Sequence, residues 1–98
     1  MKVLADLTII PIGVGTSLSA YVAACEKVLG TYPLTTALHA NGTNIEGDWD
    51  DVFTAIKACH EKLHDMGAPR IHTQIKLGTR TDRVQTMEDK VRSVQEKL

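Results

Sequence analysis

The pair Asn41-Gly42, which lies between two short β-type runs near the middle of the chain, constrains the fold more than any other feature. Both residues tolerate a positive φ, and Asn-Gly is the strongest short-range signal for a tight β-hairpin. The runs on either side, residues 34–40 and 43–47, are therefore expected to pair as antiparallel strands. Each run has an amphipathic segment on its outer side, so the hairpin lies at the centre of a longer alternating pattern.

The N-terminal part of the chain predicts a strand followed by a helix. Residues 3–10 alternate between an apolar face and a mixed face, and Pro11 is expected to end this strand because proline cannot donate to a ladder. A glycine-containing linker leads to a helix that begins near Ser17, its expected N-cap, and stops at Gly30. The apolar positions of this helix recur at helical spacing and are Leu18, Tyr21, Val22, Cys25, Val28 and Leu29.

The C-terminal part repeats this alternation and adds one segment. A second helix is expected over residues 49–66, with Asp48 as its cap. Residues 70–77 then alternate cleanly between apolar and polar, which suits a strand of a sheet with one covered and one open face. Residues 87–98 are expected to be helical. Their apolar residues, with Val84 before them, form a narrow seam typical of a helix–helix contact: Val84, Met87, Val91, Val94 and Leu98.

The order strand, helix, strand, strand, helix, strand in 98 residues predicts one domain that spans residues 1–98. The expected fold class is α+β: a ferredoxin-like βαββαβ sandwich with a four-stranded antiparallel sheet, two helices on one face and an extra C-terminal helix. The first and third strands should lie at the centre of this sheet. Its open face is expected to carry Asp6, Thr8, Asn44, Glu46, His72, Gln74 and Lys76, with Thr35 and His39 from the hairpin.

Composition limits the function classes. The net charge is −1, with basic and acidic residues interleaved, which argues against nucleic acid or an anionic membrane as a partner. No signal peptide and no membrane-spanning run is apparent, so the expected location is the cytoplasm. Cys25 and Cys59 fall on apolar helix faces and are expected to be core residues rather than a disulfide or a metal site.

Two local patterns resemble chemical motifs without completing them. Residues 60–64 match the H-E-x-x-H pattern of zinc proteases, with His60 and His64 one helical turn apart. A catalytic zinc also needs a third ligand and a cleft, and His60 lies close to the apolar stripe. Residues 13–17 resemble a phosphate-binding loop but lack its lysine. We therefore expect a protein with no catalytic residue, no metal and no cofactor.

The junction at residues 43–50 places a single carboxylate, Glu46, between a strand and a helix start, with Gly47 allowing the chain to turn. It has two interpretations, a plain strand-to-helix connection or a ligand-binding carboxylate. The open sheet face has two interpretations as well: it packs against a second copy of the chain, or it forms one wall of a pocket with convergent polar groups.

Several blocks of the sequence resemble those of one family, the small thiamine-binding-like proteins related to the YkoF domain. The similarity runs over nearly the whole chain, and the block at residues 42–50 is its most specific part. The blocks are Ile10-Pro11-Ile12-Gly13, Ser17-Leu18-Ser19-Ala20-Tyr21-Val22, Gly42-Thr43-Asn44-Ile45-Glu46-Gly47-Asp48-Trp49-Asp50, His60-Glu61, Arg70-Ile71-His72-Thr73, Thr79-Arg80-Thr81-Asp82 and Lys90-Val91-Arg92-Ser93-Val94.

The resemblance implies a ferredoxin-like fold and assembly as a dimer of dimers, a homotetramer. It also implies that some members bind thiamine or its hydroxymethylpyrimidine moiety, with no established reaction. On this basis Glu46 is the main candidate for a ligand contact, because a carboxylate accepts hydrogen bonds from an aminopyrimidine. The other candidates for the pocket wall are Thr43, Asn44, Ser17, Thr8 and His39.

The sequence therefore leads to two main functional hypotheses, and a third, a metal-dependent hydrolase at His60 and His64, lacks the third ligand and the cleft. The first is a non-catalytic cytoplasmic binding protein for thiamine or a related pyrimidine, acting in vitamin supply or sensing. The alternative is an oligomeric structural or interaction protein with no small-molecule ligand, whose open face and C-terminal helix serve only assembly. Neither hypothesis involves a nucleic acid or a membrane.

Overall fold

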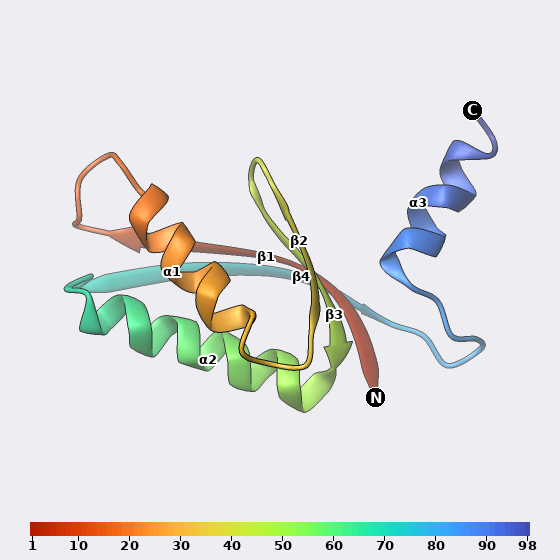
Figure 1. The fold of residues 1–98 in the computed structure, drawn as a ribbon, viewed down its shortest axis with the longest axis horizontal. Helices are drawn as coiled ribbons and strands as arrows, with labels where there is room; N and C mark the ends of the chain where they lie inside the picture. The colour runs from red at the N-terminus through yellow and green to blue at the C-terminus, as the bar shows by residue number, and fades with distance from the viewer.

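The computed structural model describes residues 1–98 and contains four strands and three helices (Figure 1). The strands form one antiparallel sheet in the order β2-β3-β1-β4, so the first and third strands are central, as predicted. The arrangement is the ferredoxin-like α+β fold expected from the sequence. In chain order the elements are β1 (Lys2–Ile12), α1 (Ser19–Leu29), β2 (Thr35–His39), β3 (Gly42–Asp48), α2 (Trp49–Asp65), β4 (Arg70–Thr79) and α3 (Met87–Gln95).

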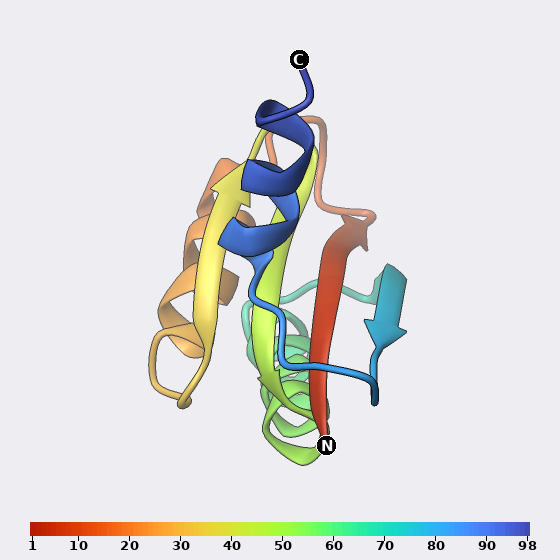
Figure 2. The same cartoon turned by 90° about the vertical axis from the view of Figure 1, so that its right-hand side faces the viewer.

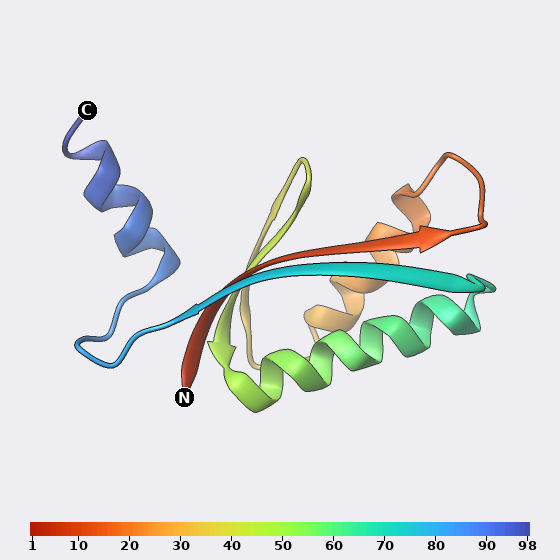
Figure 3. The ribbon, with the colours of Figure 1, turned by 180° about the vertical axis from the view of Figure 1, so that it is seen from behind.

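The two faces of the sheet are covered differently. Figure 2 shows α1 and α2 behind the sheet and α3 in front of it. The core lies on the side of α1 and α2, where Val3 and Ile45 from the sheet pack against Val52 and Leu63 from α2. On the other side, α3 has no buried residue, and it follows a connection that leads away from the end of β4 (Figure 3). None of the helices has both the length and the apolar character needed to cross a membrane.

The strand register confirms the predicted open face. Asp6 of β1 lies between Asn44 of β3 and Lys76 of β4, and paired residues of neighbouring strands point to the same side. The alternation along each strand then places the other predicted residues on this face. They are Thr8, Glu46, His72, Gln74, Thr35 and His39.

The predicted end of the first strand was wrong, because β1 continues through Pro11, which is buried, to Ile12. The pairing of β1 with β3 ends at Leu7, whereas its pairing with β4 extends to Ile12. Beyond Leu7, β1 therefore has one free edge, a position where a sheet tolerates proline.

The hairpin is formed by β2 and β3 as expected, but its turn lies one residue earlier. His39 pairs with Gly42, which leaves Ala40 and Asn41 as the two-residue loop, and neither has a positive φ. Gly42 is required for a different reason, because a Cβ atom there would lie 2.6 Å from the Leu7 carbonyl oxygen. The glycine allows β3 to approach β1 closely rather than to turn.

Around the two helix starts, the prediction of Asp48 as the N-cap residue of α2 was right in position, whereas those of Ser17 as a cap and Gly47 as a turn were wrong. Helix α1 begins at Ser19 with Leu18 as its N-cap, so Ser17 lies in the preceding loop, one residue before the N-cap position. Asp48 occupies the N-cap position of α2, but its side chain makes no capping bond and lies 3.7 Å from the N-terminal ammonium group instead. Gly47 is part of β3, not a turn, and a Cβ there would lie 2.5 Å from Leu34 Cδ2.

Candidate functional site

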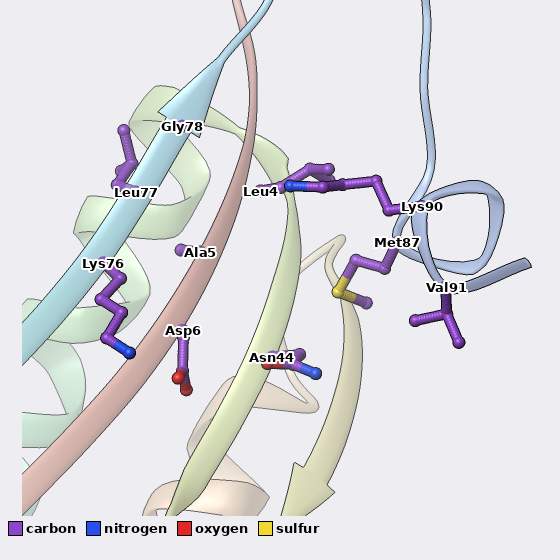
Figure 4. Close-up of a pocket in the computed structure, with 10 residues that line it drawn as sticks. All are labelled: Leu4, Ala5, Asp6, Asn44, Lys76, Leu77, Gly78, Met87, Lys90 and Val91. Carbon is purple, nitrogen blue, oxygen red and sulfur yellow. The ribbon is translucent and has the colours of Figure 1, made fainter. Parts of the chain in front are cut away.

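A pocket of about 360 Å³ lies on the open face, between the sheet and the first turns of α3 (Figure 4). We call it the α3 pocket. The sheet provides its floor and α3 provides one wall, so it exists only because the extra helix lies over this face. Its lining residues are Leu4, Ala5, Asp6, Asn44, Lys76, Leu77, Gly78, Met87, Lys90 and Val91.

The polar groups of the floor are Asp6 and Asn44 from the two central strands and Lys76 from the edge strand β4. Asp6 and Asn44 are directly paired across β1 and β3. One oxygen of Asp6 is hydrogen-bonded to His39 Nε2 at 2.8 Å, which leaves its second oxygen free. The amide of Asn44 has no hydrogen-bond partner within the chain and lines the pocket. The floor therefore offers a ligand one amide, one carboxylate oxygen and the ammonium group of Lys76.

The wall opposite the floor comes from α3. The side chain of Met87 points from the start of α3 toward Asn44, and Lys90 reaches toward Leu4 (Figure 4). The helix start is well defined because Thr86 and Asp89 form a capping box, in which each side chain accepts a hydrogen bond from the other residue's backbone N–H. The α3 pocket thus combines an apolar wall with a polar floor.

Glu46, the main candidate from the sequence, fixes the position of α3. Its Oε1 accepts a hydrogen bond from the Met87 backbone N–H at 2.7 Å, and its Oε2 lies 3.4 Å from Lys2 Nζ, with only 12% of the side chain exposed. A carboxylate is favourable at a helix N-terminus, where the N–H groups are unpaired. Glu46 does not line the α3 pocket. It is therefore a positioning residue, which holds the start of α3 over the sheet.

A second hollow of about 180 Å³, which we call the hairpin pocket, lies between α1, the far half of β1 and the β2–β3 hairpin. It brings together three predicted residues, Thr8, His39 and Thr43, among apolar side chains. The Thr43 hydroxyl donates a hydrogen bond to the Glu26 carboxylate of α1, and the Thr8 hydroxyl donates one to the Asn41 carbonyl. The remaining lining residues are Leu7, Ile9, Ile10, Leu18, Val22, Cys25, Glu26, Leu38, Ala40, Asn41 and Gly42.

The six residues predicted to contact a ligand therefore do not form one site. Asn44 lines the α3 pocket, Glu46 holds α3, and Ser17 is exposed in the loop before α1 and lines neither pocket. The other three are in the hairpin pocket. The sequence placed Asp6 on the open face, but Asp6 was not among the predicted ligand contacts. Its signal in the sequence was that it is the only carboxylate in the apolar run of β1.

The H-E-x-x-H pattern is accounted for by packing around the end of α2. His60 Nε2 is hydrogen-bonded to Thr73 Oγ1 at 2.6 Å, and His64 Nδ1 donates to the Ala68 carbonyl oxygen at 2.8 Å. Burial, and secondarily the charge of His64, lowers the pKa of His60. No group of three or more His, Cys, Asp or Glu side chains is arranged to hold a metal ion.

The two cysteines are buried in the core between α1 and α2, as their positions in the sequence predicted. The Cys59 thiol donates a weak hydrogen bond to the Cys25 carbonyl oxygen at 3.7 Å. Interaction with Cys25, together with burial, raises the pKa of Cys59 well above its usual value. This thiol is therefore protonated and behaves as a small apolar side chain.

The fold and the α3 pocket define a small ferredoxin-like protein with a half-covered sheet and an added helix over its open face. The chain belongs to the family of thiamine-binding proteins, whose family model matches residues 5–95. A UPF0045 protein of Synechocystis sp. is 59% identical over 95 residues, covering 97% of this chain and 78% of the relative. A UPF0045 protein of Methanothermobacter thermautotrophicus is 40% identical over 96 residues, covering 96% and 97% of the two chains.

Solved structures show the same architecture. A hypothetical protein of Methanocaldococcus jannaschii superposes with a TM-score of 0.90 at 35% identity, covering 97% of each chain. A Thermotoga maritima protein, whose description proposes a role in thiamine biosynthesis or salvage, has a TM-score of 0.81 at 17% identity and covers 96% of this chain and 99% of its own. The second similarity concerns the fold alone.

Proposed function

We propose that this protein is a non-catalytic cytoplasmic binding protein for thiamine or a related aminopyrimidine such as hydroxymethylpyrimidine, and that it acts in vitamin supply or sensing. The family supports a thiamine-related role. The observation that carries the choice of site is the unpaired Asn44 amide on the floor of the α3 pocket, on the residue directly paired with Asp6, whose second carboxylate oxygen is free.

The chemistry of an aminopyrimidine matches these two side chains. Its exocyclic amine is a donor that lies next to a ring nitrogen, which is an acceptor. An asparagine amide offers the complementary pair, one acceptor and one donor, as it does when asparagine reads adenine in DNA. The free oxygen of Asp6 can accept the second amine hydrogen, and hydrogen bonds to a charged acceptor are the stronger kind.

The rest of the α3 pocket suits the faces of an aromatic ring. Leu4, Met87 and Val91 provide apolar surface around the polar floor, and a thioether contact with an aromatic ring contributes roughly 0.3–1.5 kcal/mol. The volume of about 360 Å³ falls within the usual range of roughly 300–1,000 Å³ for small-molecule sites. The hairpin pocket is smaller than this range, and both of its hydroxyl groups already have acceptors within the chain.

Within this proposal Glu46 acts through α3. It holds the Met87 backbone, and so places the wall of the pocket over the ring-binding floor. His39 acts in the same indirect way, because its bond to Asp6 fixes the orientation of that carboxylate. Both are positioning residues rather than direct contacts.

Isothermal titration calorimetry with thiamine and hydroxymethylpyrimidine tests this assignment. Asn44→Ala should weaken binding by at least about tenfold, because it removes hydrogen bonds worth roughly 1–3 kcal/mol. The matched control is Gln74→Ala, which changes an amide on the same sheet face outside the α3 pocket and should bind as the wild type does. Unchanged binding by Asn44→Ala, together with loss of binding by Glu26→Gln, would assign the ligand to the hairpin pocket instead.

A second function, assembly, is favoured by the exposed apolar seam of the C-terminal segment. The predicted helix over residues 87–98 ends earlier, at Gln95, so Val84 and Leu98 lie outside α3. The exposed fractions are 84% for Val84, 61% for Val94 and 97% for Leu98, and apolar residues exposed together in one segment are typical of an interaction surface. We propose that this seam contacts another copy of the chain in a homotetramer built as a dimer of dimers. Light scattering on Val94→Asp should then show a smaller assembly than the wild type, and an identical mass would contradict the proposal.

A further inference from the structure

A second hollow on the open face, of about 450 Å³, adjoins the α3 pocket at the end of the sheet. We call it the basic pocket. It is bounded by the start of β1, the end of β4 and the connection that leads to α3. Four of its nine lining residues are cationic and none is acidic: Lys2, Leu4, Gly78, Thr79, Arg80, Arg83, Val84, Gln85 and Lys90.

The cations of the basic pocket are only partly neutralised. Lys2 pairs with Glu46, and Arg80 pairs with Asp82 and also donates to Gln85 Oε1 at 2.9 Å. Arg83 and Lys90 form no ion pair, although Arg83 is near enough to contribute to the lowered pKa of both Asp82 and Asp89. A chain with a net charge of −1 therefore concentrates positive charge at one concave position, which favours a small anion.

The basic pocket and the α3 pocket are contiguous. Leu4, Gly78 and Lys90 line both of them. Gly78 lies at the junction, paired with Leu4 on the open face. A Cβ atom on Gly78 would meet no other atom within 4 Å, so at this point the two pockets are joined by free space.

We propose that the ligand is a phosphorylated aminopyrimidine, with its ring in the α3 pocket and its phosphate in the basic pocket, where it is contacted by Arg83 and Lys90. This inference rests on the function proposed above and specifies its ligand. A phosphate monoester carries a charge of about −1.5 to −2 near neutral pH and has three acceptor oxygens. The arginine fork bonds two of these oxygens at once, and the lysine at the junction supplies a point charge.

Calorimetry with hydroxymethylpyrimidine and its monophosphate tests this inference. The wild type should bind the monophosphate at least about tenfold more tightly than the unphosphorylated compound. Arg83→Gln should remove this advantage and leave the affinity for the unphosphorylated compound unchanged. Arg70→Gln is the matched control, because it removes an exposed arginine at the other end of β4 and should keep the tenfold preference.

Gly78→Val gives an independent test of the junction. The substitution places a side chain in the free space between the pockets and introduces a residue that strands favour. Its melting temperature should match that of the wild type, and its affinity for the monophosphate should fall at least about tenfold. Unchanged affinity in a folded Gly78→Val variant would show that the ligand does not pass this point, and would overturn the proposal.

The outcomes separate this inference from the proposed function. Equal affinities of the wild type for the two compounds would overturn the phosphate assignment and leave the aminopyrimidine function standing. If neither compound binds but inorganic pyrophosphate does, and if this binding is lost in Arg83→Gln, the aminopyrimidine function is overturned and only an anion site remains. Loss of affinity for both compounds in Arg83→Gln would also overturn the phosphate assignment.

Discussion

The two faces of the sheet differ in how their residues are used, and adjacent residues of β3 show the contrast. Ile45 points toward α1 and α2 and is completely buried, whereas Glu46 points to the other face and reaches the start of α3. The covered face packs apolar side chains from β1, β3 and β4 and from two helices into one core. On the open face, α3 contributes no buried residue, and polar side chains surround two hollows.

This difference suggests that stability and ligand binding depend on separate sets of residues. The covered face has enough buried apolar surface to hold the fold together. The contacts that hold α3 are few and mainly polar, chiefly the Glu46–Met87 hydrogen bond. Elements with little buried surface open at a lower free energy than the core. We therefore expect α3 to detach without global unfolding, which would open the α3 pocket to a ligand.

The largest difference should appear when one apolar side chain is truncated on each side of the sheet. Leu63 of α2 is completely buried and Val91 of α3 is 57% exposed. Leu63→Ala should lower the free energy of unfolding by about 2–5 kcal/mol, because it leaves a cavity. Val91→Ala should change it by less than about 0.5 kcal/mol. Urea denaturation checks both, and equal losses would mean that α3 belongs to the core.

Glycine substitutions should give the next largest contrast. A Cβ at Gly42 would lie 2.6 Å from a backbone carbonyl oxygen of β1, whereas a Cβ at Gly78 would meet nothing within 4 Å. Gly42→Ala should cost about 1–3 kcal/mol, because β3 has to move away from β1. Gly78→Ala should be neutral or stabilise the protein by up to about 1 kcal/mol, since alanine restricts the unfolded chain. Thermal denaturation distinguishes the two, and a neutral Gly42→Ala would show that the hairpin adapts easily.

A smaller and local effect is expected when the attachment of α3 is weakened. Glu46→Gln keeps the shape of the side chain but removes the charge that favours the α3 N-terminus and pairs with Lys2. Amide hydrogen exchange in α3 should accelerate by about tenfold, because a charge-assisted hydrogen bond becomes a neutral, weaker one, while exchange in α2 stays unchanged. Glu88→Gln, which alters an exposed carboxylate of α3, is the control. Equal acceleration in α2 would show that the two faces unfold together.

The elements and the two faces of the sheet were predictable from the sequence, whereas the close contacts between strands were not. Periods of two and of about 3.6 residues are local properties of the sequence. They predicted the order of strands and helices, the two central strands and the residues that lie on the open face. The roles of Pro11 and Gly42 were misjudged because they depend on the neighbouring strand. Where the pairing of β1 with β3 ends and how closely the two strands approach are set by packing between distant segments.

The candidate site was predictable only in part, for a related reason. The alternation of β3 correctly placed Asn44 and Glu46 on the open face. The wall of the α3 pocket could not be predicted, because the position of α3 depends on a hydrogen bond between Glu46 and Met87, which are 41 residues apart. No local pattern in the irregular connection before α3 specifies where that helix will lie.

The smallest expected effect concerns pH and tests the covered side alone. Burial lowers the pKa of His60 below its ordinary value of 6.5, and the His64 charge adds to this. The unfolded chain therefore binds more protons at His60 than the folded protein, so acidification through pH 6.5 toward the folded-state pKa destabilises the protein. His60→Gln removes this proton-linked loss of stability, and the glutamine can keep a hydrogen bond to Thr73. Relative to the wild type, the variant should become more stable as the pH falls from 7.5 to 5.5. Urea denaturation at the two pH values measures this change, and a constant difference would show that His60 is as well hydrated as the residues of the open face.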